Sequence, residues 1–317
     1  MMDNRQISPQ KNAGFTMKKK LSANGMEPIL FNTFNTIFMI CLVVVTLYPF
    51  LNTIAVSFNE GNDTIRGGIY LWPRAWTLQN YKAVFATGTI FDAFVVSVAR
   101  TVISTILNIF LTTMLAYTLS RREYVFRGPI TVIFVLTMYF SAGLIPAYFL
   151  IKDLHLLNSF WVYILPSMIS AFNMIVIRTY IGTIPESLME SARIDGAGDF
   201  RIFMKVVLPL CKPVLATIAL FVAVGAWNSW FDAFIYTSSR QHLSTLQYEL
   251  MKLLSSTMSS NGNPNVQGMD QDSARAMVTP LSIRAAITVV ASVPILLVYP
   301  FMQKYFVVGL NVGSVKE

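Results

Sequence analysis

The segment at residues 93–119 reads AFVVSVARTVISTILNIFLTTMLAYTL and contains one charged residue, Arg100. A helix of about 20 mostly apolar residues is long enough to cross the hydrocarbon core of a bilayer. This segment therefore predicts a membrane-spanning helix. Five more stretches have the same character, at 37–56, 130–151, 160–177, 213–236 and 285–306. The predicted fold is all-α, a polytopic membrane protein with six transmembrane helices.

The composition of the whole chain agrees with this class. Of the 317 residues, 54% are apolar and 13% are charged, whereas an average soluble domain has about 25% charged residues. These values exclude a disordered chain and argue against a soluble enzyme. Two cysteines and two histidines, far apart in the sequence, are too few for a disulfide framework or a metal cluster. No metal site is predicted.

The distribution of basic residues predicts the orientation. Of the 24 Lys and Arg residues, fifteen fall on the side of the N-terminus, eight on the other side and one within a span. Cytoplasmic loops carry the excess of positive charge, so both termini are predicted to be cytoplasmic. Residues 1–29 form a cytoplasmic tail, and 30–317 form the six-span domain. The net charge of +8 is explained by topology, and no binding of nucleic acid is expected.

The loop between the fourth and fifth spans has an unusual pattern. Residues 185–194 predict a short helix with a proline and acids in its first turn. A turn follows at Asp195 and Gly196, and residues 200–208 predict a second short helix that Pro209 ends. Both helices have apolar faces, which a loose linker would not need. The interpretation is a cytoplasmic helix–turn–helix that transmits a push from a partner to the adjoining spans as a rigid body.

The residues of this loop resemble a known motif. Glu190, Ser191 and Ala192 are followed at the right spacing by Gly196, Val206, Leu208 and Pro209, which is similar to the EAA loop of ABC importer permeases. Ser191 and Val206 are mild departures from that motif. Asp195, Gly196 and Ala197 match its sugar-permease version. Segments 76–81, 226–231 and 305–316 resemble the maltose-permease-like carbohydrate group, and segments 141–146 and 157–161 resemble its branch for complex poly- and oligosaccharides.

The resemblance implies a non-catalytic permease subunit with an importer core at about 90–308 and a coupling loop at about 179–212. It also implies the partners: a second homologous permease subunit, two cytoplasmic ABC ATPase subunits, an extracellular solute-binding protein or lipoprotein, membrane lipid and a carbohydrate substrate. ATP and Mg²⁺ belong to the partner ATPase, and this chain carries no Gly-x-x-x-x-Gly-Lys-Ser/Thr phosphate loop. The residues expected to couple to the ATPase are Glu186, Glu190, Ser191, Ala192, Asp195, Gly196, Ala197, Leu208 and Pro209.

Sugars are bound by aromatic faces and by planar polar side chains. The candidates for the wall of a substrate path are Tyr139, Asn173, Trp227, Asn228 and Trp230. An amide in mid-span that faces lipid is costly, although Asn173 and Asn228 could equally form hydrogen bonds between helices. Arg100 and Asp232 are expected to pair within the membrane, with a gate or a proton relay as the alternative.

Three other possibilities remain open from the sequence. The importer could carry a polyol or glycerol phosphate, the chain could be a stand-alone secondary transporter, or it could be a membrane-embedded enzyme. The last two need coupling groups or clustered acids that the spans do not offer. A predicted amphipathic helix in the external segment 237–283 could lie on the bilayer, pack on the protein or receive a partner; its apolar face holds Leu243, Leu246, Leu250, Leu253 and Leu254.

Overall fold

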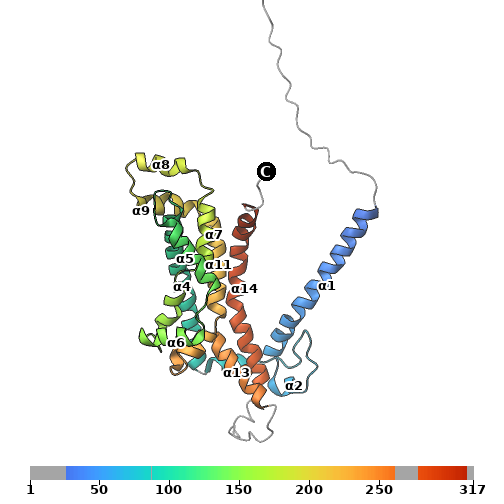
Figure 1. Ribbon diagram of the computed structural model, residues 1–317. Coiled ribbons are helices and arrows are strands. Elements are labelled where there is room, and N and C mark those ends of the chain that lie inside the picture. Colours follow the sequence, from blue (N-terminus) through green and yellow to red (C-terminus); the bar gives the residue numbers. More distant parts are fainter. Residues whose placement is uncertain (1–25, 87, 261–277, 313–317) are drawn as a thin grey trace, which may run out of the picture. The chain divides into compact units, whose positions relative to one another are not determined.

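The computed structural model describes residues 26–86, 88–260 and 278–312, and its regular secondary structure within them consists of helices and one isolated bridge between Asn59 and Trp76. It separates into two units, Met1–Phe50 and Leu51–Glu317. In chain order the α-helices are α1 (Met26–Ser57), α2 (Gly61–Ile65), α3 (Gln79–Ala86), α4 (Gly88–Ser120), α5 (Arg127–Tyr139), α6 (Leu144–Asp153), α7 (Ala171–Ile181), α8 (Glu186–Ile194), α9 (Asp199–Ile202), α10 (Leu208–Leu210), α11 (Lys212–Asn228), α12 (Phe231–Tyr236), α13 (Leu246–Ser260) and α14 (Pro280–Val312) (Figure 1).

The prediction of an all-α polytopic membrane protein is confirmed. Three helices contain uninterrupted stretches long and apolar enough to cross a membrane, in α1, α4 and α14. Three bent helix pairs have the same apolar character, which brings the number of candidate spans to between three and six. The predicted tail at 1–29 falls mostly outside the described residues, and so does the end of the C-terminal segment 305–316.

The third predicted span, 130–151, is not one straight helix. It is formed by α5 and α6, which meet at an angle of 119°. At the break Gly143 has a φ of +87°, a left-handed conformation that side chains with a Cβ atom resist. Pro146 lies in the first turn of α6, where its missing N–H has no intrahelical partner to lose. The sequence 140–146 thus ends one helix and starts another.

The fourth and fifth predicted spans are also interrupted. Residues 160–167 form two short 3₁₀ turns, and α7 begins only after Ser170, whose hydroxyl accepts a hydrogen bond from the Asn173 N–H. The fifth predicted span, 213–236, breaks after α11, and its remainder is α12. At this second break the Ser229 carbonyl accepts a hydrogen bond of 3.0 Å from Arg100 Nη1. A backbone group freed within the membrane is satisfied in this way.

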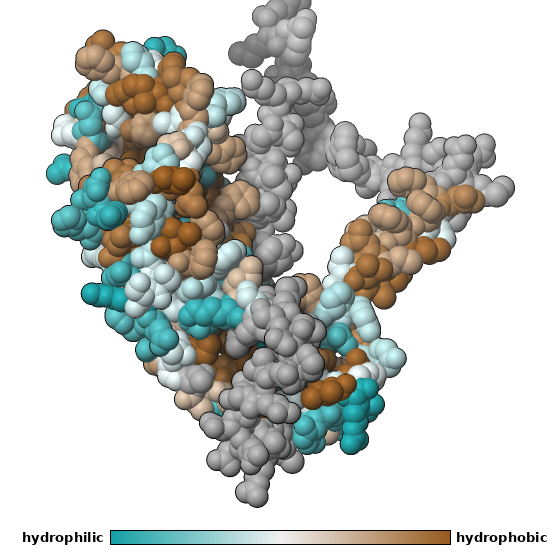
Figure 2. Space-filling view, turned by 60° about the horizontal axis from the view of Figure 1, so that its bottom comes forward, coloured by the Kyte–Doolittle hydropathy of each residue, from teal (hydrophilic) through white to brown (hydrophobic). Residues whose placement is uncertain are grey.

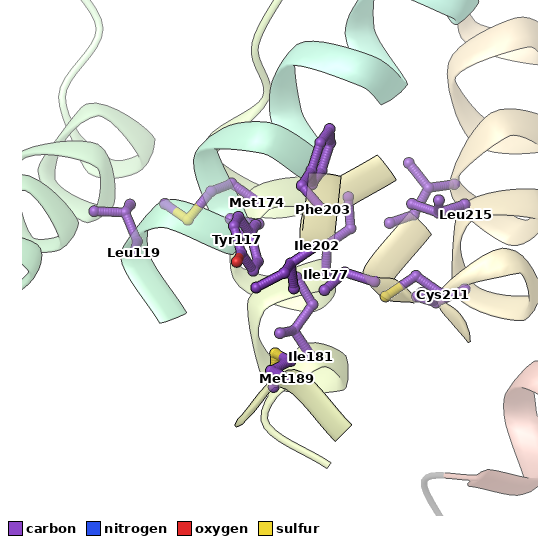
Figure 3. Packing of buried hydrophobic residues seen from close by; sticks show 14 residues of the cluster. Tyr117, Leu119, Met174, Ile177, Ile181, Met189, Ile202, Phe203, Cys211 and Leu215 are labelled. Carbon is purple, nitrogen blue, oxygen red and sulfur yellow. The ribbon is translucent and has the colours of Figure 1, made fainter. Parts of the chain in front are cut away.

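The helices of the second unit are held together by buried apolar clusters. The largest joins the C-terminal part of α4 to α7, α8 and the beginning of α11. Figure 3 shows Phe203, Ile202 and Ile177 close to Tyr117 in this cluster, with Met189 next to Ile181. A second cluster joins α3, α4, α11, α13 and α14. These contacts fix both ends of α4, the helix from which the fold was predicted.

The connecting segments gather at two ends of the bundle. The α4–α5 loop and the segment 182–211 meet at one end, because Arg193 bonds Glu123. At the other end the Asn158 N–H donates to the Tyr236 carbonyl at 2.9 Å. Figure 1 shows α8 and α9 at the first end and α6 and α13 at the second. This grouping agrees with the alternation of loops used to predict the topology, while the cytoplasmic identity of the first end stays a prediction.

The helix predicted within residues 237–283 packs on the protein. Leu246 is fully buried and Leu250 partly buried against α3, α4 and α14. The helix begins at Leu246, so Leu243 lies in a 3₁₀ turn before it. The side chains of Leu253 and Leu254 lie outside those that the structure describes. Of the three possibilities left open by the sequence, packing on the bundle is the one observed.

The outer surface of the bundle remains rich in apolar side chains. Figure 2 shows brown patches between white and teal ones on the visible face. Examples of exposed apolar residues are Val132 and Ile133 on α5 and Leu296 and Leu297 on α14. Soluble monomers rarely expose this much apolar surface, which marks contact with a membrane or with other subunits.

Asn59 organises the segment between α1 and α3, and its removal should destabilise it. Its Oδ1 accepts hydrogen bonds from the N–H groups of Arg74 and Ala75 at 2.8 and 2.9 Å. Asn59→Ala removes the acceptor of both partly buried bonds, and one such hydrogen bond contributes about 0.5–1.5 kcal/mol to stability. We expect a clearly lower thermal unfolding midpoint of the purified chain, whereas the exposed neighbour variant Asn62→Ala should keep the wild-type midpoint. Equal midpoints for the two variants would contradict this role.

Candidate functional site

The helix–turn–helix predicted at 185–208 is present, beginning with α8. Pro185 precedes its first residue and Glu186 lies in its first turn, while Arg193 lies in its last turn. This placement of charges complements the helix dipole. Pro185 and Glu186 thus favour the start of a helix at the position where α8 begins. Met189 is buried, and Glu186, Glu190 and Ser191 are exposed.

α8 ends in a Schellman motif built around Gly196. The Gly196 N–H donates to the Arg193 carbonyl at 2.9 Å, and the Ala197 N–H donates to the Ala192 carbonyl at 2.9 Å. Gly196 has a φ of +80°. These are the two bonds and the left-handed residue that define this helix end. Gly196 is thus needed for the backbone conformation that reverses the chain from α8 toward α9.

The second half of the device differs from the prediction. α9 is followed by a π-helical turn, Phe203–Val207, and helix continues through α10 to Leu210. Pro209 therefore does not end the helix. The Leu208 N–H donates to the Phe203 carbonyl, a bond five residues back that widens the turn just before Pro209. Proline at the start of the new turn has no N–H to leave unpaired.

The helix–turn–helix at 185–208, called the device below, has one face that is buried against the bundle and another that is exposed. Met189, Ile202, Phe203 and Val207 are buried in the cluster of Figure 3. The exposed apolar side chains are Leu188, Ile194, Phe200 and Met204, with Ile194 86% exposed. Exposed apolar groups concentrated on a helix–turn–helix are typical of a contact surface for another protein.

Arg193 fixes this device to the α4–α5 loop. Its two terminal nitrogens donate to the Glu123 carboxylate at 2.7 and 2.9 Å, and Nη2 also approaches Asp199 at 3.3 Å. The hydrogen bonds from Arg193 hold the pKa of the Glu123 carboxyl below its ordinary value, and they raise the pKa of the Arg193 guanidinium. The bidentate geometry also adds orientational specificity, which a single surface ion pair lacks.

Because of this ion pair, we expect the protection of α8 from amide hydrogen exchange to depend on pH. Because the folded pKa of Glu123 is lowered, its contribution is complete above the ordinary carboxyl pKa of about 4.3 and is lost as the pH falls through the folded value. At pH 7 we expect slower amide hydrogen exchange of α8 in the wild type than in Glu123→Gln. Below the folded pKa the two should exchange alike. Asp153→Asn, an exposed carboxyl at the other end of the bundle, is the control; a Glu123→Gln variant identical to wild type at pH 7 would refute the role.

The structure places all nine predicted coupling residues in this device. Three of them, Asp195, Gly196 and Ala197, form the turn after α8. Two others, Leu208 and Pro209, lie in α10. The others, Glu186, Glu190, Ser191 and Ala192, lie on α8. Their contact with an ATPase remains a prediction.

A second candidate site is a cavity of about 550 Å³ between α4, α7 and α11, whose wall combines polar and apolar side chains. Of the five predicted path residues, Asn173 is among those that line it. Trp227 is buried, with its indole N–H donating to the Ala291 carbonyl at 2.9 Å. Tyr139 is 80% exposed, and the Asn228 amide oxygen accepts a hydrogen bond from Gln247. Trp230 packs against Phe231 and Phe234.

The wall of this cavity consists largely of residues that the sequence reasoning did not select. Arg100, Ser104 and Asn108 line it from α4 and are buried. They recur every four residues, and buried Ser97 and Thr112 extend the same stripe. A polar stripe at helical spacing along a membrane-spanning helix was the signal that could have found them.

The predicted pairing of Arg100 with Asp232 is confirmed. Arg100 Nη2 donates to Asp232 Oδ2, which also accepts a hydrogen bond of 2.9 Å from the Ser229 hydroxyl. The guanidinium lies over the Tyr163 ring, 4.6 Å from its centroid. The charge of the arginine is thus balanced on the cavity wall. A buried charge requires such compensation.

Comparisons with known proteins agree with these features. The model of the family described as "Binding-protein-dependent transport system inner membrane component" matches residues 86–312. The polygalacturonan/rhamnogalacturonan transport system permease protein YtcP of Bacillus subtilis (strain 168) is 39% identical, over 88% of this chain and 96% of that protein. The arabinooligosaccharides transport system permease protein AraQ of Halalkalibacterium halodurans is 30% identical, over 95% of this chain and 100% of that protein.

A solved structure is similar as well. It is a chain from the crystal structure of a bacterial ABC transporter involved in the import of the acidic polysaccharide alginate. That chain is 27% identical, with a TM-score of 0.81 over 89% of this chain and 99% of that one. The overall arrangement of helices is therefore similar to that of a chain known from experiment.

Proposed function

The chain belongs to the family of binding-protein-dependent transport system inner membrane components, and we propose that it forms half of the translocation path of an ABC importer for carbohydrates derived from oligo- or polysaccharides. As a member of this family it is a non-catalytic permease subunit of the inner membrane, and ATP is bound by a partner ATPase. The observation that carries the carbohydrate assignment is the near full-length similarity to sugar-polymer permeases.

The coupling device has the mechanical properties that this function needs. Its buried face joins α8 and the π turn to α4, α7 and α11, and Arg193 ties it to the preceding loop. A force applied to the exposed face of α8 is therefore transmitted to the bundle instead of being absorbed by a flexible loop. The exposed acids Glu186, Glu190 and Asp195 dock onto the ATPase, and Glu190 pairs with a basic residue there. ATP-driven closure of the ATPase then turns the path from inward- to outward-facing.

The assembly contains three further kinds of subunit. A second homologous permease completes the path, two ABC ATPase subunits bind at the end of the bundle that holds α8 and α9, and an extracellular solute-binding protein or lipoprotein delivers the sugar at the other end. Both chain termini are cytoplasmic. This orientation is supported by the excess of Lys and Arg on the α8 side.

Transport by the reconstituted assembly tests this function. The chain is purified together with its partner permease and ATPase and reconstituted in liposomes, and the solute-binding protein is added. We expect ATP-dependent uptake of an oligogalacturonide, a rhamnogalacturonan fragment or an arabinooligosaccharide, and no uptake by the chain alone. A phosphate-loop lysine variant of the ATPase is the negative control. Uptake by the chain alone, or uptake of glycerol phosphate or a polyol with no uptake of any oligosaccharide, would overturn the proposal.

A further inference from the structure

The segment that connects α1 to α3, residues 58–78, is tied to the end of α1. The helix ends one residue before Phe58, and Trp76 forms the isolated bridge with Asn59 directly after that end. Beside this bridge the Thr77 N–H donates to the Phe58 carbonyl at 2.8 Å. The bridge therefore holds Trp76 at the level at which α1 ends.

A second attachment places the middle of this segment alongside the last turns of α1. The Asn52 amide, which belongs to α1, donates to the carbonyls of Ile69 and Tyr70 at 2.8 and 2.9 Å. Asn52 precedes Ser57 by about 7–8 Å on the helix axis, at the ordinary rise of an α-helix. An amide within a membrane span is costly unless it is bonded, and these two bonds satisfy both of its N–H groups. The chain thus returns along the helix after leaving it.

The segment is also braced from within by Arg74. Its Nε donates to the Asp63 carboxylate at 3.0 Å, and its Nη2 donates to the Gly67 carbonyl at 2.6 Å. The Arg74 N–H bonds Asn59, as described above. A segment with this many bonds to itself and to α1 cannot easily turn its side chains away from its surroundings. The surface that it presents is therefore fixed before any partner binds.

This fixed surface consists of large aromatic and apolar side chains. Trp72 is 72% exposed and Trp76 is 59% exposed, and their rings meet edge to face with centroids 5.4 Å apart. Tyr70, Leu71 and Leu78 are exposed as well. Contact with water leaves the stabilisation available from burying such side chains unused. A concentration of this kind marks a contact surface.

The level of these side chains identifies what they contact. The apolar stretch of α1 ends at Ser57, and the polar residues Asn59 and Glu60 follow it, so the hydrocarbon core of the membrane ends near this point. Trp and Tyr are enriched at this boundary, because an apolar ring carries one polar N–H or O–H group. The bridge and the Asn52 bonds hold the aromatic side chains there. A docking site for a water-soluble protein has no need to lie beside the last turns of a span.

From these observations we propose that residues 69–78 form an interfacial anchor, a surface that binds the headgroup layer of the membrane at the end of α1. The rings of Trp72 and Trp76 lie among the first carbons of the acyl chains, and their indole N–H groups donate to lipid oxygens. The braced segment then fixes the depth of α1 in the bilayer. This anchor does not depend on which solute the importer carries.

Quenching of tryptophan fluorescence by brominated phospholipids tests the anchor. The assembled importer is reconstituted in nanodiscs without its binding protein. The emission of Trp72 is the difference between the wild type and Trp72→Phe, so that all other tryptophans of the complex cancel. We expect lipids brominated near the headgroup end of the acyl chains to remove most of this emission. Lipids brominated near the end of the chains should remove less of it, and aqueous iodide should remove little.

Asn62→Trp is the matched control, because Asn62 is exposed on α2 within the same segment. Its added emission should be quenched by iodide and not by brominated lipid. Trp76→Phe gives the second reading if Trp72→Phe does not assemble.

Three results would overturn the anchor. Quenching of Trp72 by iodide without quenching by lipid would place it in water. Protection from both quenchers would show burial against the partner permease. Protection from iodide that begins only when the binding protein is added would show a docking surface for that protein.

Discussion

Gly196→Pro should reduce ATP-driven uptake by the assembled importer to background while the chain still inserts and assembles with its partner permease. Gly196 has a φ of +80°, and proline is restricted to about −65°. Proline also lacks the N–H that bonds the Arg193 carbonyl. Both bonds of the Schellman motif are lost, so α8 no longer leaves the turn in a fixed direction. The ATPase then moves a flexible segment instead of the bundle.

The neighbouring glycine provides a matched control. Gly198 has a φ of −71°, within the range of proline, and a Cβ atom placed at either glycine meets no other atom within 4 Å. Gly198→Pro should therefore retain most of the uptake. The readouts are sugar-stimulated ATPase activity and uptake in proteoliposomes, with assembly checked by size-exclusion chromatography. Normal stimulation in Gly196→Pro would show that the turn does not transmit the coupling motion.

Glu190→Lys should abolish sugar-stimulated ATPase activity without changing the stability of the chain. Glu190 is exposed on α8, next to buried Met189, so its replacement disturbs no packed contact. A charge reversal at a docking surface replaces an attraction with a like-charge repulsion, which is more damaging than loss of the contact alone. We therefore expect Glu190→Gln to show a partial loss and Glu190→Lys a nearly complete one.

Two further variants separate docking from a general charge effect. Asp153→Lys reverses an exposed acid at the other end of the bundle and should leave stimulation intact. Reversal of the basic partner on the ATPase to an acid should restore activity to Glu190→Lys. If Glu190→Lys hydrolyses ATP and transports sugar like the wild type, Glu190 is a solvated surface acid and the docking assignment is wrong.

Local sequence rules were sufficient for part of this molecule. The long apolar run of residues 93–119, in which Arg100 is the one charged residue, specified a membrane helix, and the spacing from Glu190 to Pro209 specified the helix–turn–helix and its glycine. These features depend on interactions within a few turns of chain, which composition and spacing determine directly. The interruptions of the spans were harder to predict. Gly143 and Pro166 were visible in the sequence, but membrane helices tolerate both residues, so a kink and a complete break could not be distinguished.

Only the tertiary structure decided which face of each helix packs against other helices and which face lines a cavity. Apart from the polar stripe of α4, the spans have almost no polar face that would indicate their orientation, so the sequence could not tell that Trp227 packs toward α14. The Arg193–Glu123 pair joins residues 70 positions apart, and Arg100 reaches Asp232 across 132. The sequence by itself thus determined the membrane class and the helix–turn–helix at 185–208, because both depend on neighbours in the chain. The cavity and its charge balance depend on how separate helices rotate against one another, and only the packed bundle fixes that rotation.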